Sequence, residues 1–285
     1  MRIESAARTW AHRHGLHRSR AVVATYRGIS RVRYRNAWES EVAFRGRKFQ
    51  IGRDLTLYPA VHTGGFEAEE LDMLLPMVSR DAQVWDVGAN IGIYAVLLAD
   101  AAPNGHVNAF EPVPETHARL VGNIERNGLT TVTVHRVALS DQPGTARMAV
   151  HPEAHGCDQI GEVEEGAVAI EVGTLTGDDF LAGSPHGDPD VVKVDIEGHE
   201  PEFLQGAWGM FERRRPLLIM EVNPSAWHSE ERVRTWQETL ARLFDLYGEG
   251  TWFDAGHPST VDHVDTSGLD EQRAYTLLFA GLART

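Results

Sequence analysis

A strand, a glycine-rich turn and a helix follow one another within residues 84–94, which read VWDVGANIGIY. The first four residues are an apolar run suited to a buried strand, and residues 91–99 (IGIYAVLLA) predict a helix. The turn between them carries Gly88, Asn90 and Gly92. Such a turn brings backbone N–H groups and a helix N-terminus to one edge of a parallel sheet. We therefore expect a sheet that binds a nucleotide-like ligand.

The spacing of the glycines narrows the choice of ligand. The turn reads G-x-N-x-G, whereas the dinucleotide-binding fingerprint reads G-x-G-x-x-G. Asn90 occupies the place of the second glycine, which in that fingerprint lets the backbone approach a pyrophosphate. A ligand without a pyrophosphate fits better, and S-adenosylmethionine is the candidate. An NAD(P)-dependent oxidoreductase is the alternative that this argument disfavours.

An acidic residue follows the next predicted strand. Residues 106–110 (HVNAF) form that strand, and Glu111 stands at its carboxyl end, just before Pro112. A carboxylate at this place accepts hydrogen bonds from both hydroxyls of a ribose. Alternatively, Glu111 caps the helix that is predicted over residues 115–127. Its distance from the glycine turn favours the ribose contact.

Five short motifs occur in a characteristic order along the chain. They are DVGANIG (86–92), FEP (110–112), NGL (127–129), ALSD (138–141) and KVDIEGHE (193–200). In this set the sequence resembles the FkbM-type family of S-adenosylmethionine-dependent methyltransferases, over about residues 63 to 224. The resemblance implies a Rossmann-like class I methyltransferase fold and, in most members, O-methylation of small molecules such as sugars or polyketides. N- or C-methylation on the same fold is the alternative.

The order of predicted elements indicates an α/β protein with a doubly wound, mostly parallel sheet of seven strands. Its strands are expected at residues 84–87, 106–110, 132–137, 191–194, 217–221, 250–253 and 275–279. The antiparallel end of the sheet is implied by the resemblance alone. We divide the chain into an arm of helices and short β segments (1–62), and a methyltransferase domain (63–285) that binds S-adenosylmethionine.

The candidate cofactor contacts lie where strands of such a sheet end. We expect Asp86 and Gly88 near the methionine part, Glu111 at the ribose, and Ala138, Leu139 and Ser140 around the adenine. Glu67 is a further candidate, because the resemblance places the loop at this point near the cofactor. The full predicted set is Glu67, Asp86, Gly88, Asn90, Gly92, Glu111, Ala138, Leu139 and Ser140.

Polar residues after the strands at 191–194 and 217–221 are the candidates for catalysis. An alcohol must lose a proton during methyl transfer, which calls for a base or a metal ion. His199 is the first choice for the base because its unperturbed pKa is near neutrality, and Asp195 and Glu197 are the other catalytic candidates. Alternatively, the residues around His199 only cap the helix that starts near Pro201.

Three residues after the strand at 217–221 are candidates for the substrate site: Glu221, Asn223 and Trp227. No metal is favoured, but Mg²⁺ is possible, with Asp195, Glu221 and Asn223 as its ligands. His151, His155, Cys157 and Asp158 lack the spacing of a zinc site, and we interpret residues 151–166 as a loop that covers the substrate.

Charge is distributed unevenly along the 285 residues. Residues 1–53 contain 13 of the 27 lysines and arginines but only 3 of the 41 acidic residues. The acidic remainder and the lack of a recognition motif argue against nucleic-acid binding, so we expect the arm to pack on its own domain or to form a homodimer. A single cysteine and the lack of a long apolar run predict a cytoplasmic protein that neither spans a membrane nor needs a disulfide. The expected partner is a small-molecule substrate.

Overall fold

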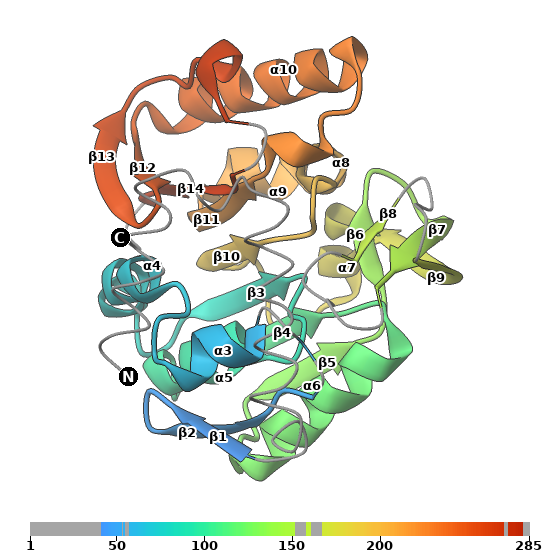
Figure 1. Cartoon of the computed structure of the whole chain (residues 1–285), viewed down its shortest axis with the longest axis vertical. Helices are drawn as coiled ribbons and strands as arrows, with labels where there is room; N and C mark the ends of the chain where they lie inside the picture. The colour runs from blue at the N-terminus through green and yellow to red at the C-terminus, as the bar shows by residue number, and fades with distance from the viewer. Residues whose placement is uncertain are drawn as a thin grey trace, which may run out of the picture.

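The computed structural model describes residues 41–52, 54, 57–151, 158–160, 167–270 and 273–281. A sheet of eight strands runs through the middle of this region (Figure 1). In spatial order the strands are β13 (His257–Val261), β12 (Gly250–Asp254), β14 (Tyr275–Phe279), β11 (Leu217–Val222), β10 (Val191–Val194), β3 (Gln83–Val87), β4 (His106–Phe110) and β5 (Val132–His135).

The chain builds this sheet outwards from its centre. From β3 it adds β4 and β5 on one side, then returns to add β10 and β11 on the other. These five strands are parallel, whereas β14 is antiparallel to both of its neighbours, β11 and β12. The predicted doubly wound, Rossmann-like fold is confirmed. The direction of winding reverses between β3 and β10, which is where such sheets bind their ligands.

The main sheet has one strand more than the seven predicted. β13 pairs with β12 as an antiparallel hairpin at the edge of the sheet. Ala255 and Gly256 form the connecting turn with φ of 52° and 80°, the two positive values of a type I′ turn. This strand was not predicted because it contains Pro258 and three exposed polar residues instead of an apolar run. Such residues are tolerated in an edge strand, which has a hydrogen-bonded neighbour on one side only.

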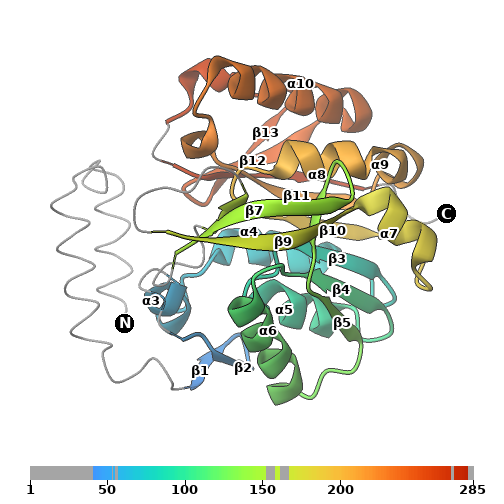
Figure 2. The ribbon, with the colours of Figure 1, turned by 90° about the vertical axis from the view of Figure 1, so that its right-hand side faces the viewer.

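Helices cover both faces of the main sheet (Figure 2). One face carries α3 (Leu57–His62), α4 (Ala68–Leu74), α5 (Ile93–Ala101) and α6 (Pro114–Arg126), and the other α7 (Gly177–Gly183), α8 (Glu200–Gly206), α9 (Trp208–Arg214) and α10 (Glu230–Tyr247). Short 3₁₀ turns are η2 (Leu75–Met77), η4 (Pro224–Ala226) and η5 (Thr266–Gly268). Neighbouring strand residues alternate between the faces, so Val84 packs with α5 and Trp85 with α8 and α9.

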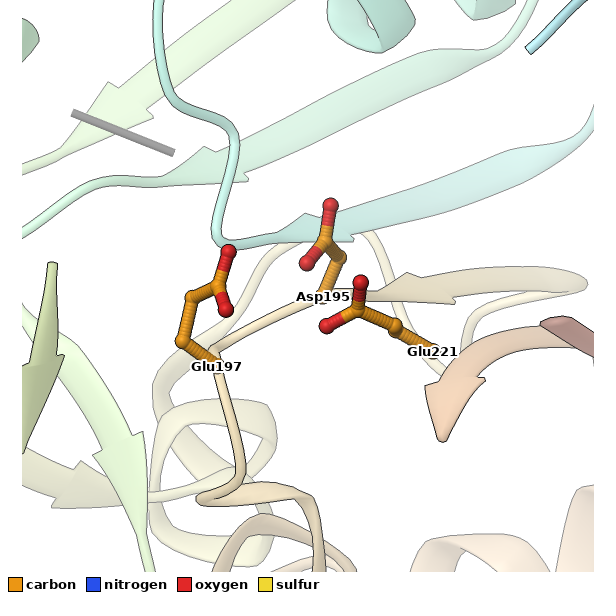
Figure 3. A group of neighbouring side chains, drawn as sticks. All are labelled: Asp195, Glu197 and Glu221. Atoms are coloured by element: carbon orange, nitrogen blue, oxygen red, sulfur yellow. The ribbon is translucent and has the colours of Figure 1, made fainter. Parts of the chain in front are cut away.

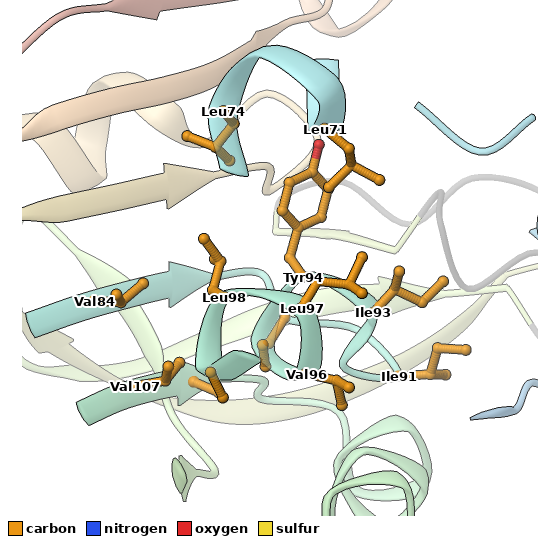
Figure 4. Packing of buried hydrophobic residues seen from close by; sticks show 14 of the residues in the cluster. Leu71, Leu74, Val84, Ile91, Ile93, Tyr94, Val96, Leu97, Leu98 and Val107 are labelled. Carbon is orange, nitrogen blue, oxygen red and sulfur yellow. The ribbon is translucent and has the colours of Figure 1, made fainter. Parts of the chain in front are cut away.

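Helix α5 is apolar all round because it has neighbours on opposite sides. Figure 4 shows α5 between Val84 and Val107 of the sheet and Leu71 and Leu74 of α4. Every residue from position 93 to position 99 is buried. This helix follows the glycine turn directly, so its packing fixes the position of the turn against the sheet.

A second sheet stands beside the first and consists of β6 (Ala138–Ser140), β9 (Val168–Thr176), β7 (Gly144–Val150) and β8 (Gln159–Ile160). The strand predicted over residues 132–137 ends at His135, and the chain then enters β6. Residues 138–140, predicted to follow that strand, therefore form a strand of their own, parallel to β9.

The hairpin of β1 (Glu41–Phe44) and β2 (Arg47–Gln50) packs against α6. The backbone N–H of Gln50 donates to Asn123 Oδ1 at 2.8 Å, and Phe49 is fully buried in the same core cluster as α5. The described part of the predicted arm thus shares the core of the domain. Residues 1–40, on which the predicted homodimer contact depends, lie outside the described residues. None of the described helices is long and apolar enough to cross a membrane.

Candidate active site

A cavity of about 300 Å³ lies at the carboxyl ends of β3, β4, β10 and β11, where the direction of winding reverses. Helix α3 and the second sheet complete its wall through Leu57, Met148 and Ile160. The sequence-predicted residues that line it are Glu67, Gly88, Asn90, Glu111, Ala138, Leu139, Asp195, Glu197, His199 and Glu221. The fold therefore brings ten predicted residues, from the cofactor, catalytic and substrate sets, into one cavity.

The glycine turn is fixed tightly to the neighbouring strands. The N–H groups of Gly88 and Ala89 donate to the Phe110 carbonyl at 3.1 and 2.9 Å. Gly88 has a φ of 75°, and a Cβ atom there would lie 1.9 Å from the carbonyl oxygen of Asp195. Only glycine permits both this φ and this approach. The turn therefore touches the chain that carries the catalytic candidates.

Glu111 bridges the glycine turn and the segment after β4. Its Oε2 accepts the N–H of Asn90 at 3.0 Å, and its Oε1 accepts the N–H of Val113 at 2.8 Å. Burial raises the pKa of this carboxyl to about 7, against the opposing effect of the two N–H donors. Each carboxylate oxygen can accept a further hydrogen bond, so Glu111 is able to hold a ribose as predicted.

Three predicted cofactor contacts lie outside the cavity lining. Asp86 points to the α5 side of β3 and is fully buried, 3.5 Å from Lys193 Nζ. Gly92 is the N-cap residue before α5, and a Cβ there would lie 2.3 Å from Leu120, so a glycine at this position allows α6 to pack closely. Ser140 shares a hydrogen bond of 2.9 Å with His199 Nε2. In each case the alternation of a strand or the packing of a helix turns the residue away from the cavity.

Three carboxylates come together at the carboxyl ends of β10 and β11, with Asp195 and Glu197 after β10 and Glu221 in the last part of β11. Oxygens of Asp195, Glu197 and Glu221 lie within 4.8 Å of one another, and Figure 3 shows the three side chains pointing toward a common space. Burial, reinforced by the neighbouring carboxylates, raises the pKa of Glu197 and of Glu221 well above the ordinary value. We call Asp195, Glu197 and Glu221 the carboxylate group.

Two predicted substrate residues, Asn223 and Trp227, are not in the cavity lining. Asn223 donates its amide to Glu197 Oε2 at 3.2 Å, while its Oδ1 accepts hydrogen bonds from Ser225. Trp227 packs on Trp236 with 5.4 Å between ring centroids. Glu197, rather than the predicted Asn223, therefore joins Asp195 and Glu221 as the third oxygen donor of the group.

His199 lines the cavity, but both of its ring nitrogens have partners. Nε2 shares a hydrogen bond with Ser140, and Nδ1 lies 3.5 Å from a carboxylate oxygen of Glu202. Burial lowers the pKa of His199, against the opposing effect of Glu202. The ring of His199 thus lies between β6 and α8, which suits a residue that supports the wall of the cavity.

Lys193, which was not among the predicted site residues, is a buried cation beneath the glycine turn. Its ammonium donates to the Gly88 carbonyl at 2.9 Å and lies 3.5 Å from Asp86 and from Asp195. It also stands 5.3 Å from the ring centroid of Tyr94. Lys193 thus ties the turn to the first member of the carboxylate group. The sequence did contain a sign of this residue, because a lysine in the otherwise apolar strand VVKV is expected to be buried and paired.

Two further residues, Tyr94 and Asp158, also line the cavity without having been predicted as contacts. The Tyr94 hydroxyl donates to Glu67, whose pKa burial raises to about 7. Asp158 accepts the N–H of His151 at 2.6 Å and belongs to the segment interpreted as a covering loop. His155 and Cys157 of that segment lie outside the described residues.

A solved structure and two curated relatives are similar to this chain. A hexuronic acid methyltransferase, AglP, from Haloferax volcanii is 36% identical over 141 residues, which cover 49% of this chain and 56% of that protein. The 31-O-demethyl-FK506 methyltransferase FkbM of Streptomyces tacrolimicus is 39% identical over 71 residues, covering 25% of this chain and 27% of that protein. The chain thus spans only part of these relatives. The crystal structure of methyltransferase FkbM from Methylobacillus flagellatus KT is 17% identical, with a TM-score of 0.45, over 70% of this chain and 44% of that one.

The family model provides the broadest match. The methyltransferase FkbM domain matches residues 86–246, a range that begins at Asp86 and includes the whole carboxylate group. It covers more than half of the 285 residues. The chain belongs to the FkbM methyltransferase family.

Proposed function

We propose that this protein transfers a methyl group from S-adenosylmethionine to a hydroxyl oxygen of a sugar-like or natural-product small molecule. One observation carries the proposal. The glycine turn and Glu111, on the β3 and β4 side, line the same cavity as the carboxylate group on the β10 and β11 side. A nucleotide-like cofactor and a polar acceptor therefore have adjoining places.

The residues of the β3 and β4 side fit the cofactor. Glu111 would accept hydrogen bonds from the ribose hydroxyls, and Ala138 and Leu139 of the neighbouring β6 would contact the adenine. When bound, S-adenosylmethionine supplies an electrophilic methyl carbon on a positively charged sulfur. The acidic lining, which includes Glu67, suits this charge and that of the cofactor's ammonium group. Lys193 keeps the turn and Asp195 in one fixed arrangement.

Asp195 accepts the proton of the acceptor hydroxyl in this proposal. Bound S-adenosylmethionine would supply the methyl group to the acceptor oxygen, and the electron pair of the broken carbon–sulfur bond would stay on sulfur. Asp195 has a side chain that is 35% exposed, so an acceptor in the cavity can reach it. His199, the predicted base, has both ring nitrogens occupied by protein partners and supports the wall instead.

The name of the relative from Haloferax volcanii, a hexuronic acid methyltransferase, supports sugar-like acceptors. We would incubate the protein with methyl-labelled S-adenosylmethionine and with hexuronic acids and neutral glycosides. Transfer to a hydroxyl gives an ether, whose label survives mild alkali. Label released as methanol would show a carboxyl ester, and label on nitrogen or carbon would support the alternative acceptors. Either result would refute O-methylation of a hydroxyl.

Replacing Asp195 with asparagine tests the assigned base. We expect kcat to fall by about 100-fold or more, because general-base catalysis contributes roughly that factor. The affinity for S-adenosylhomocysteine should stay close to that of the unmodified protein. His199→Gln is the comparison, for which a smaller loss of kcat is expected. If His199→Gln loses more activity than Asp195→Asn, the base is His199, as the sequence predicted.

A further inference from the structure

The carboxylate group is short of positive charge. Asp195 lies 3.5 Å from Lys193, but among the described residues no ion pair reaches Glu197 or Glu221. In the described part of the chain, the only hydrogen-bond donor to these two side chains is the neutral amide of Asn223, at 3.2 Å from Glu197 Oε2. Carboxylates at such short separations repel one another strongly when ionised. The arrangement in Figure 3 therefore requires protons or a cation between the side chains.

Glu221 provides an independent sign of a missing ligand. Its Oε2 atom is buried and has no hydrogen-bond partner among the described residues, although the side chain points into the common space of the group. A buried carboxylate oxygen without a donor is costly, and native proteins nearly always satisfy such atoms. Because Glu221 also lines the cavity, a ligand that enters the cavity can reach this oxygen.

We propose that Asp195, Glu197 and Glu221 bind one divalent cation of the hard, oxygen-preferring class, such as Mg²⁺ or Mn²⁺. All three donors are carboxylate oxygens, which this class of ion selects. Their mutual distances, up to 4.8 Å, fit a common ion. Ligands of an octahedral ion at about 2.1 Å lie about 3 Å apart when adjacent and about 4.2 Å apart when opposite. A slight inward movement of the side chains completes the site.

The other residues that line the cavity also favour a hard cation over a soft metal that prefers nitrogen or sulfur ligands. His199 directs Nε2 to Ser140 and has Nδ1 3.5 Å from Glu202, and the carboxylate group itself contains only oxygen donors. The cavity lining also contains Glu67, Glu111 and Asp158 against the single ammonium of Lys193. This excess of carboxylates attracts cations into the cavity and repels anions.

The consequence for the reaction rests on the proposed function. A cation on the carboxylate group would hold the acceptor hydroxyl and lower the pKa of that hydroxyl. Near neutral pH the proton would then pass to the oxygen of Asp195 that does not bind the ion. The metal thus selects an acceptor whose hydroxyl can coordinate an ion, and a vicinal diol or a hydroxy acid provides two oxygens for this purpose.

The test uses the chelator-treated full chain and Mn²⁺ alone, whose free form gives a strong paramagnetic resonance signal. We expect one Mn²⁺ per chain, displaced by excess Mg²⁺. Glu221→Gln and Glu197→Gln should each weaken binding by about tenfold or more. Glu67→Gln is the matched control, since it makes the same change in the same cavity outside the carboxylate group. It should alter the Mn²⁺ dissociation constant much less.

Circular dichroism and titration with S-adenosylhomocysteine on the same samples separate the outcomes. No Mn²⁺ binding by a folded chain that still binds S-adenosylhomocysteine would overturn the metal site and leave the cofactor assignment standing. Mn²⁺ binding that survives both Glu221→Gln and Glu197→Gln would also overturn it. If Glu221→Gln does not fold, the Mn²⁺ dissociation constants of Asp195→Asn and Glu197→Gln provide the test, and unchanged values in both would overturn the site.

Discussion

At the scale of single residues, Gly88 is the point where the glycine turn packs directly against the backbone of Asp195. Gly64 shares its φ of 75° but has no atom within 4 Å of a built Cβ, whereas at Gly88 that Cβ would lie 1.9 Å from the Asp195 carbonyl. The two glycines differ in contact and not in backbone conformation. They therefore separate the effect of a clash from the effect of strain.

Gly64→Ala should cost only the strain of a left-handed residue, about 1–2 kcal/mol. Gly88→Ala should destabilise by about 1–3 kcal/mol more, because the turn must move off β10. It should also abolish binding of S-adenosylhomocysteine, which Gly64→Ala should retain. Urea denaturation and calorimetric titration of both variants measure these effects. Equal losses of stability would mean that the contact at Asp195 relaxes without cost.

The Glu111 carboxyl predicts that cofactor binding is linked to a proton. Burial raises its pKa to about 7 in the free protein, so at lower pH it is mostly protonated. Ribose hydroxyls donate to the ionised form, so bound cofactor favours loss of the proton. Affinity for S-adenosylhomocysteine should therefore fall as the pH drops below about 7, by up to tenfold per unit. Glu111→Gln should bind weakly with a flatter profile. Identical slopes for the two proteins would contradict this assignment.

At the scale of elements, α8 lies directly on β6. A Cβ on Gly206, the last residue of α8, would lie 1.9 Å from the Ser140 carbonyl oxygen. This close contact fixes the packing distance between α8 and β6. The same pair of elements carries the hydrogen bond between His199 and Ser140.

Gly206→Ala should therefore lower the free energy of unfolding by about 1–3 kcal/mol, as overpacked positions do. Gly122, inside α6, has nothing within 4 Å of a built Cβ, so Gly122→Ala should instead stabilise by about 0.5–1 kcal/mol. Chemical denaturation of the two helix variants gives both values. A Gly206→Ala protein as stable as Gly122→Ala would show that α8 is free to move from β6.

Elements were predictable where local composition decides them. β10 matches the predicted range, because three valines and one lysine stand between Asp190 and Asp195. Lys193 escaped prediction because its partner depends on register. Lys193 stands opposite Asp86 when β10 pairs with β3. The two residues are 107 positions apart in the sequence, and a single sequence does not reveal which distant strands pair. The same pairing shows why Asp86 is an ionic partner of Lys193 beneath the cavity.

The candidate site was predictable to the same extent. Strand ends identify Glu111, Asp195 and Glu221, since parallel strands place their carboxyl ends at one edge. The sequence could not show which side chains after those ends turn inward. Asn223 follows β11 directly, whereas Glu197 stands three residues after β10, yet a hydrogen bond to Glu197 and a local turn to Ser225 hold the Asn223 amide outside the cavity lining.

At the scale of the whole molecule, β14 joins two parts of the main sheet. It pairs with β11 through five residues and with β12 through three, and Leu277 and Phe279 are fully buried. A chain that ends before residue 273 should lose cooperative unfolding and bind S-adenosylhomocysteine poorly. A chain that ends after residue 281 keeps β14 whole and is the control. Thermal unfolding by circular dichroism compares them, and a cooperative transition in the shorter chain would contradict the prediction.

The place of β14 also bears on how the protein is made. A ribosome releases β11 and β12 before β14, so a nascent chain exposes two unpaired edges in the middle of its future sheet. Such edges readily pair with other chains. Slow translation after residue 254 would prolong that exposure, and chaperones that bind extended apolar segments would shorten it. The yield of active protein in a cell should therefore depend on the speed with which residues 255–279 are synthesised.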